Sequence, residues 1–257
     1  MKLATFNVNS ARLRAPHLRR WLEHAQPDAV VLQEIKCEEH QFPALDFESL
    51  GYKASIVGQK AYNGVALLSR LPFEVIHRRL PGLPEDDAQA RYIEAAVDGI
   101  TLIGIYLPNG NSGGETGFAY KLRWMDLLAE RAAALLEDDT PTIILGDFNV
   151  CPTDADLAPG ALPRTDALVR PESRARFRTL LNMGLTDAIR TMHPREQVWT
   201  FWDYQGGAWE RDCGLRIDHL LLSPTLAERM DAAGADRAPR GEAQPSDHVP
   251  AWVVLAD

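Results

Sequence analysis

Carboxylate, amide, phenol and imidazole side chains follow several short apolar runs of this 257-residue chain. They are Asn7, Asn9, Glu34, Tyr106, Asn109, Asp147, Asn149, Asp218, Asp247 and His248. An isolated carboxylate is costly to bury, so a fold that brings the four acids of this set together needs cations or protons among them. The set therefore predicts a bound divalent metal ion.

The ligand types indicate which metal this would be. Carboxylate and amide oxygens, rather than thiolates or clustered imidazoles, suit Mg²⁺ or Mn²⁺ and argue against zinc. Such a metal would lie beside a carboxylate that can accept a proton from water, amides that can donate to phosphate, and the adjacent pair Asp247-His248. Together these groups predict hydrolysis of a phosphodiester or phosphomonoester.

Taken singly, several of these residues also have a purely structural explanation. Glu34 could be a solvated acid at a strand end, and GDFN (146–149) and QPSDHVP (244–250) could be plain turns. Asp218 is harder to explain in this way, because apolar residues flank it and a buried acid needs a partner. His248 is available as that partner.

The spacing of apolar residues predicts the elements that must position these side chains. KLATFNV (2–8) and DAVVLQEI (28–35) read as strands on either side of a helix, and a longer helix is expected over 118–136. Further strands are expected at GVALLSR, FEVIHRR, YIEAAV, TLIGIYL, TIILGDF, VWTFWDY, LRIDHLLLS and AWVVLAD. Because LRIDHLLLS is apolar on both faces, we expect two sheets packed together with helices outside, in one domain spanning 1–257.

The composition limits the class of protein. The chain is 46% hydrophobic and carries a net charge of −9, so it is globular and is not a simple basic binder of nucleic acid. Three widely spaced cysteines indicate neither a disulfide framework nor a zinc site. The first residues contain no secretory leader, and no apolar run is long enough to span a membrane. We therefore expect a soluble, cytoplasmic monomer.

Seven motifs, in chain order, resemble those of the exonuclease III family of apurinic/apyrimidinic endonucleases. They are FNVNSARLR, LQEIK, GVALLSR, IYLPNG, ILGDFN, GLRIDHLLLS and PSDHVP. That family lies within the endonuclease/exonuclease/phosphatase (DNase I-like) superfamily. The resemblance implies an α/β (α+β) four-layer sandwich, in which two packed mixed β-sheets are flanked by helices.

The resemblance also implies a function. The chain would be a metal-dependent nuclease of base excision repair that acts on double-stranded DNA and incises it 5′ to abasic sites. It would also have 3′→5′ exonuclease and 3′-phosphatase activity at 3′ ends. Its cofactor would be one or two Mg²⁺ or Mn²⁺ ions.

The same resemblance implies a role for each matching residue. Glu34 would be the principal metal ligand, and the implied metal set is completed by Asn7, Asn9, Asp147, Asn149, Asp247 and His248. Asp147 would activate or orient the attacking water. The side chains that contact the phosphate would be Tyr106, Asn109 and Asn149. Asp218 would orient His248, which donates to a phosphate oxygen.

DNA contacts are expected around this site. The implied phosphate or DNA contacts are Asn109, Asn111, Lys121 and Arg216. A pocket for the abasic sugar would be formed by Phe201, Trp202 and Leu215. For Trp202, packing in an aromatic core is the alternative, and Leu215 stands where some members of the family have Trp.

Two other functions compete with this one. Another branch of the superfamily would hydrolyse a small phosphorylated molecule or a lipid headgroup, but it should lack the arginine-bearing loop after GDFN and the Phe201-Trp202 pair. A catalytically silent DNA-binding or scaffold protein would have lost at least one of the central acids or the imidazole. None is missing from this sequence.

Overall fold

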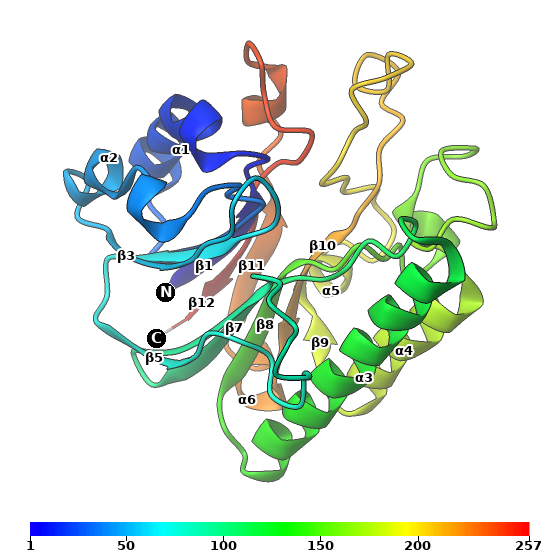
Figure 1. Cartoon of the computed structure of the whole chain (residues 1–257), viewed down its shortest axis with the longest axis horizontal. Helices are drawn as coiled ribbons and strands as arrows, with labels where there is room; N and C mark the ends of the chain where they lie inside the picture. Colours follow the sequence, from blue (N-terminus) through cyan, green and yellow to red (C-terminus); the bar gives the residue numbers. More distant parts are fainter. Residues whose placement is uncertain (257) are drawn as a thin grey trace.

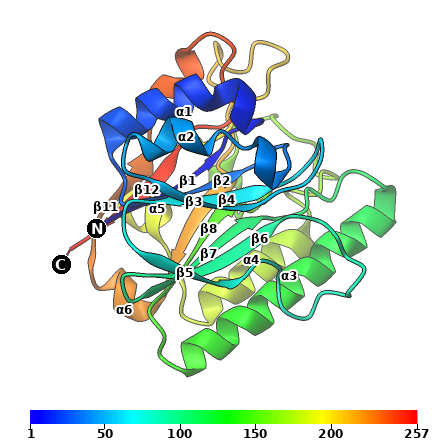
Figure 2. The ribbon, with the colours of Figure 1, turned by 60° about the vertical axis from the view of Figure 1, so that its left-hand side comes forward.

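Two six-stranded β-sheets lie face to face, and helices cover the outer face of each (Figures 1 and 2). The computed structural model describes residues 1–256. In the first sheet the order is β11 (Met230–Ala235), β12 (Ala251–Leu255), β1 (Lys2–Asn7), β2 (Ala29–Gln33), β4 (Val65–Ser69) and β3 (Lys53–Val57). In the second it is β5 (Phe73–His77), β6 (Tyr92–Val97), β7 (Ile100–Tyr106), β8 (Thr142–Asp147), β10 (Asp218–Leu222) and β9 (Thr186–Asp187).

The helices complete the layers. α1 (Ala11–Ala25) and α2 (Ala44–Glu48) pack on the first sheet, and α3 (Gly114–Glu137) and α4 (Pro171–Asn182) pack on the second. Two short helices, α5 (Ala188–Met192) and α6 (Pro224–Ala227), follow β9 and β10.

Three apolar cores hold these layers together. The core between the sheets includes Leu3, Leu145 and Leu220, whereas Trp21 of α1 and Trp124 of α3 belong to the two outer cores between helices and sheets. All five residues of β10 are buried, as expected for a strand that is covered on both faces. The predicted four-layer sandwich is thereby confirmed.

Strand direction places the candidate residues at one end of the molecule. β1 pairs with β2, and β7 with β8, in parallel. A parallel pair needs a crossover, and α1 and α3 supply the two crossovers here. β10 runs antiparallel to β8, so it begins where β8 ends, and Asp218 is the register partner of Asp147.

One predicted strand is absent from the described chain. The run VWTFWDY (198–204) makes only isolated bridges, from Phe201 to Leu215 and from Phe201 to His248. The backbone N–H groups of Ile217 and Asp218 donate to the Thr200 hydroxyl, each at 3.1 Å, instead of to main-chain carbonyls. This side chain takes the place of ladder hydrogen bonds.

The long second helix begins earlier than predicted. It starts at Gly114 rather than near 118, because residues 114–117 already form the first turn of α3. Within residues 1–256, no helix is both long enough and apolar enough to cross a membrane.

Candidate active site

Five of the predicted residues meet at the end of the molecule where strands from both sheets converge. They are Asn7 at the end of β1, Glu34 directly after β2, Tyr106 at the end of β7, Asp147 at the end of β8, and Asp218 at the start of β10. The parallel pairing of β7 and β8 sets Tyr106 beside Asp147. The site therefore joins residues from both sheets.

Asn7 links the two principal carboxylates. Its Nδ2 donates to Glu34 Oε1 and to Asp147 Oδ2, each at 2.9 Å, and its Oδ1 accepts from the backbone N–H of Asn9 at 3.1 Å. This buried amide thereby holds Glu34 and Asp147 together. Its oxygen has a second lone pair, so the metal role of Asn7 stays a prediction.

Asp147 is buried at the centre of the site. The backbone N–H of Asn149 donates to its Oδ1 at 2.9 Å. Burial raises the pKa of Asp147 to about 7, although the charge of His248 opposes this rise. The preceding Gly146 is required, because a Cβ at this φ of 153° would lie 2.0 Å from the carbonyl oxygen of Ile105.

His248 lies between two carboxylates. Its Nδ1 donates to Asp218 Oδ2 at 2.8 Å, and its Nε2 lies 3.7 Å from Asp147 Oδ2. Burial alone would lower the pKa of His248, but the charges of Asp218 and Asp147 raise it to about 10. The imidazole is therefore protonated at neutral pH and can donate from Nε2.

The two carboxylates fit a hard cation. Atoms of Glu34, Asp147 and His248 lie within 4.8 Å of one another, and the ligands in this group are the carboxylates, because a protonated imidazole has no lone pair for a metal. Burial opposes ionisation of Glu34, but the Lys36 ammonium, 2.8 Å from Oε2, lowers the pKa of Glu34. Two ionisable carboxylates this close together need a cation to offset their charge, and carboxylate oxygens suit Mg²⁺ or Mn²⁺.

Asn9 and Asp247 lie beside this cluster rather than within it. Asn9 Nδ2 donates to Asp247 Oδ1 at 3.1 Å, and Lys36 Nζ donates to Asn9 Oδ1 at 2.5 Å. Lys36 thus takes one of the two lone pairs of the Asn9 amide oxygen, and the metal role of Asn9 stays a prediction. Lys36 has no motif signal beyond its position two residues after Glu34 in LQEIK.

The remaining polar side chains line the same pocket, which has a volume of about 240 Å³. Asn109 Nδ2 donates to Asn149 Oδ1, and Asn149 Nδ2 donates to the carbonyl of Leu107, each at 2.9 Å. Burial raises the pKa of Tyr106 well above its usual range, so this phenol keeps its proton. Arg91 stacks on the Tyr106 ring at 4.6 Å.

One wall of this pocket is apolar. It contains Phe201 and Leu215, as expected, together with Leu162, Leu168 and Ile217. The chain positions of Leu162 and Leu168, in an irregular loop, carry no pattern that would have revealed them. The apolar wall thus lies directly beside the carboxylates.

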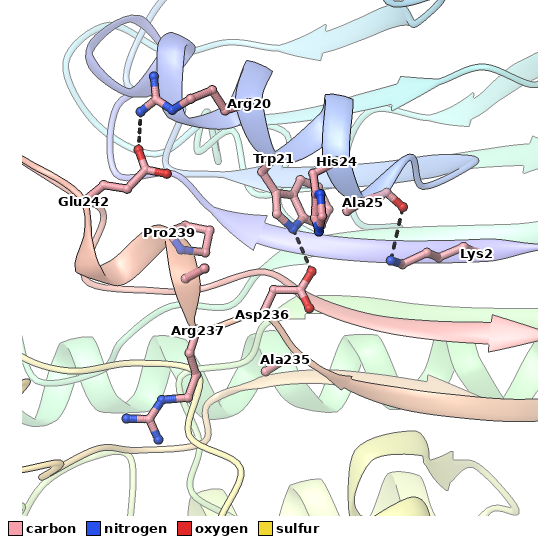
Figure 3. Close-up of a pocket in the computed structure, with 11 residues that line it drawn as sticks. Lys2, Arg20, Trp21, His24, Ala25, Ala235, Asp236, Arg237, Pro239 and Glu242 are labelled. Atoms are coloured by element: carbon pink, nitrogen blue, oxygen red, sulfur yellow. Dashed lines mark hydrogen bonds and ion pairs between the residues drawn. The ribbon is translucent and has the colours of Figure 1, made fainter.

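A larger hollow, of about 610 Å³, lies between α1 and the segment after β11 (Figure 3). Its polar groups are largely bonded to one another: Arg20 pairs with Glu242, and Trp21 donates to Asp236. It contains none of the residues predicted for catalysis. The larger of the two pockets is therefore not the one that contains the candidate catalytic residues.

Sequence comparison agrees with this geometry. A model described as the Endonuclease/Exonuclease/phosphatase family matches residues 4–248. The chain belongs to the endonuclease/exonuclease/phosphatase family.

Within this family the chain is similar to DNA nucleases. It is 36% identical over 264 residues to exodeoxyribonuclease III of Haemophilus influenzae, with 98% of each chain covered. An AP endonuclease from Archaeoglobus fulgidus superposes with a TM-score of 0.93 at 36% identity, over 99% of each chain. The 3′ phosphatase NExo from Neisseria, bound to a product DNA hairpin, has a TM-score of 0.94 at 37% identity, over 100% of each chain. The predicted resemblance to the exonuclease III family is confirmed, and the chain is a hydrolase of the nuclease type.

Three contacts carried over from this metal-dependent family are corrected by burial. Lys121 is fully buried, and its Nζ donates to main-chain carbonyls. Arg216 is 1% exposed and pairs with Asp156 and Asp187. Neither Lys121 nor Arg216 is therefore available to DNA. Trp202 does not line the catalytic pocket: it is buried against Trp209, and its Nε1 donates to Asp212.

Asn111 also makes contacts within the protein. Its Oδ1 accepts from the backbone N–H of Ala167 at 2.8 Å, and its Nδ2 donates to Asp166. Its exposed side chain lines the catalytic pocket, so the predicted contact with DNA remains open to it.

Proposed function

We propose that the chain hydrolyses phosphodiester bonds of double-stranded DNA on the 5′ side of abasic sites and also removes residues and phosphates at 3′ ends. One observation supports this proposal above others. The acidic group of Glu34 and Asp147 shares a small pocket with the apolar wall that contains Phe201 and Leu215. Such a pocket offers hydrolytic chemistry and a place for a sugar without its base.

The proposal includes a divalent metal, Mg²⁺ or Mn²⁺, held by Glu34 and Asp147. When bound, such a metal neutralises phosphate charge and makes water more acidic. Asp247 would act on this metal site from its edge, through Asn9 or water. Titration of the protein with Mg²⁺ or Mn²⁺ would measure whether one or two ions bind.

The residues of the chain have distinct tasks in this proposal. Asp147, held by Asn7 and by the backbone of Asn149, accepts the proton of the attacking water. Its raised pKa suits that task, because a base works best when its pKa lies near the working pH. His248 donates from Nε2 to a phosphate oxygen, and Asp218 keeps this imidazole oriented and protonated.

The neutral donors complete the phosphate site. The amide N–H groups of Asn109 and Asn149 and the phenol of Tyr106 would donate to phosphate oxygens. Donors that are already in place stabilise developing charge without reorganisation when the reaction occurs. Each amide nitrogen has two N–H groups, so Asn109 and Asn149 can keep their present contacts through one N–H and donate to the phosphate with the other.

DNA suits the site better than a small phosphorylated molecule does. Residues of the loops 158–170 and 203–214 line the catalytic pocket. These loops project from one end of the fold (Figure 1). A small molecule would not need such an extended rim. We further propose that the whole chain acts as one domain and as a cytoplasmic monomer.

The test uses three labelled duplexes: one with a single abasic-site analogue, one undamaged with a recessed 3′ end, and one with a 3′-phosphate. Each is incubated with the protein in Mg²⁺ and in chelator. We expect metal-dependent incision 5′ to the lesion, and Glu34→Gln should require more metal for the same rate. Cleavage that persists in chelator would show that the reaction does not need a metal ion. Cleavage at 3′ ends without incision at the lesion would restrict the function to 3′ processing.

A further inference from the structure

Lys121 on α3 is a buried lysine that the proposed reaction does not use; burial lowers its pKa to about 7, although the charges of Asp147 and Asp166 oppose this fall. Its side chain is fully buried. Its Nζ donates to the carbonyl oxygens of Asn109 at 3.0 Å, Asn149 at 2.6 Å and Ala167 at 3.3 Å. An ammonium has three N–H donors, and all three are matched here.

The three carbonyls belong to different segments of the site. Asn109 follows β7, Asn149 follows β8, and Ala167 lies in the loop before α4. Close packing around the lysine also depends on Gly110, because a Cβ there would lie 2.6 Å from Lys121 Cδ. One side chain thus connects three segments that approach the catalytic pocket.

We propose that Lys121 is a positioning residue that fixes the amide side chains of Asn109 and Asn149 toward the phosphate by holding the main-chain carbonyls of the same two residues. This inference rests on the proposed function. A buried charge is weak support for stability, since an apolar side chain of similar size often replaces it without loss. Geometry at the reacting centre is a stronger reason, because a displacement of about 1 Å can cost roughly 100-fold in rate.

The experiment compares Lys121→Met with the wild type and with a matched control. Met has a similar length but no donor. The control is Ser173→Ala, which removes a buried hydroxyl that donates to the same Ala167 carbonyl at 2.7 Å and touches neither amide residue. We expect Lys121→Met to lower kcat by about 10- to 100-fold with KM within about 3-fold of wild type, and Ser173→Ala to leave kcat unchanged.

A double-mutant cycle separates positioning from general destabilisation. In a background of Asn109→Ala and Asn149→Ala, Lys121→Met should lower single-turnover rates by less than about 3-fold, because the groups it positions are already absent. An undiminished effect in that background would overturn the inference. So would an unchanged kcat in folded Lys121→Met protein.

If Lys121→Met does not fold, Lys121→Gln provides the second test, since the glutamine amide keeps a donor at this position but lacks the length and the three N–H groups of the lysine. It should lower kcat in the same direction, and an unchanged kcat would count against the inference. The wild-type rate in each assay keeps the two proposals apart. Failure of the wild type to cleave refutes the proposed function, whereas equal rates of wild type and variant refute only the role of Lys121.

Discussion

At the scale of single residues, burial and neighbouring charge decide which groups can exchange protons. Asp147, Asp218 and His248 form a buried group in which one imidazole lies against two carboxylates. The charges of the two acids raise the pKa of His248, whereas burial raises the pKa of Asp147. The arrangement separates a proton donor from a proton acceptor within one small site.

Asp147→Asn should abolish turnover and preserve DNA binding. The amide keeps an oxygen for the N–H of Asn149 but cannot accept a proton from water. General-base catalysis is typically worth about 10²- to 10⁴-fold, so kcat should fall by at least that range. The measurement pairs single-turnover cleavage with a binding assay on the same duplex. Full activity in this variant would show that another group activates the water.

Asp218→Asn should impair His248 without unfolding the protein. The change removes the charge that favours the imidazolium, and we expect kcat to fall by about 10²- to 10⁴-fold. The asparagine oxygen can still accept from His248 Nδ1, so the variant should remain folded, with a lower melting temperature because the charge that stabilises the imidazolium is lost. A large drop in melting temperature with normal kcat would instead indicate that Asp218 is structural.

At the scale of elements, a buried ionic network anchors β10, the strand that begins with Asp218. Arg216, just before the strand, bonds to Asp156 at 2.8 Å and to Asp187 at the end of β9 at 2.8 Å. Its Nη1 also donates to His219 Nδ1, whose Nε2 donates to the carbonyl of Val150 at 2.9 Å. These contacts hold the backbone on both sides of Asp218 against the loop after β8.

His219 should make the protein less stable in mild acid. Burial lowers the pKa of His219 to about 4, whereas the unfolded chain has a His pKa of about 6.5. The unfolded state therefore binds a proton that the folded state does not, and stability is lost as pH falls from about 6.5 toward 4, by up to about 3 kcal/mol. The raised pKa of His248 acts above this window, where its contribution is lost as pH rises from about 6.5 toward 10.

Melting temperatures of metal-free wild type and His219→Gln between about pH 7.5 and 5 test this slope by their difference, because Asp147, whose pKa of about 7 lies in this range, contributes a slope of opposite sign to both proteins. His219→Gln, which keeps a donor and an acceptor, should lose less stability than the wild type as the pH falls. His40→Gln, at an exposed position, is the control and should leave the curve unchanged. An identical slope in wild type and His219→Gln would assign the acid sensitivity to another group.

At the scale of the whole molecule, a chain of net charge −9 must bind a polyanion through local patches. Basic residues near the site lie in the loop that contributes Leu162 and Leu168 to the catalytic pocket. Arg164 is exposed in this loop. Binding should therefore depend on a few phosphate contacts rather than on the overall field.

DNA affinity should fall steeply with salt, and Arg164→Ala should lower the slope of log K against log salt by about 1. Lys53→Ala is the control. Lys53 is exposed and pairs with Ser69, the last residue of β4. This position lies at the end of the sheet that is opposite to the site. Equal slopes for wild type and Arg164→Ala would place the phosphate contacts elsewhere.

Much of the architecture was predictable from the chain alone, because strand and helix periodicity act over a few residues. The strand-helix-strand start of the chain, the long helix before β8 and the polar residues at strand ends all follow from such local patterns. The prediction of a strand over 198–204 was wrong for the same reason. The local composition favours a strand, but the Thr200 hydroxyl accepts two backbone hydrogen bonds that would otherwise belong to a strand ladder.

Only the packing of the two sheets decided which polar side chains face the substrate pocket. Asn7 and Asp147 lie 140 positions apart, and their contact exists because β1 and β8 belong to facing sheets. Segments distant in the sequence also bury Lys121, Arg216 and Trp202, which the sequence alone had placed on the DNA side. Residue types set the chemistry that is available, whereas burial and partners, which depend on distant segments, set charge, orientation and access.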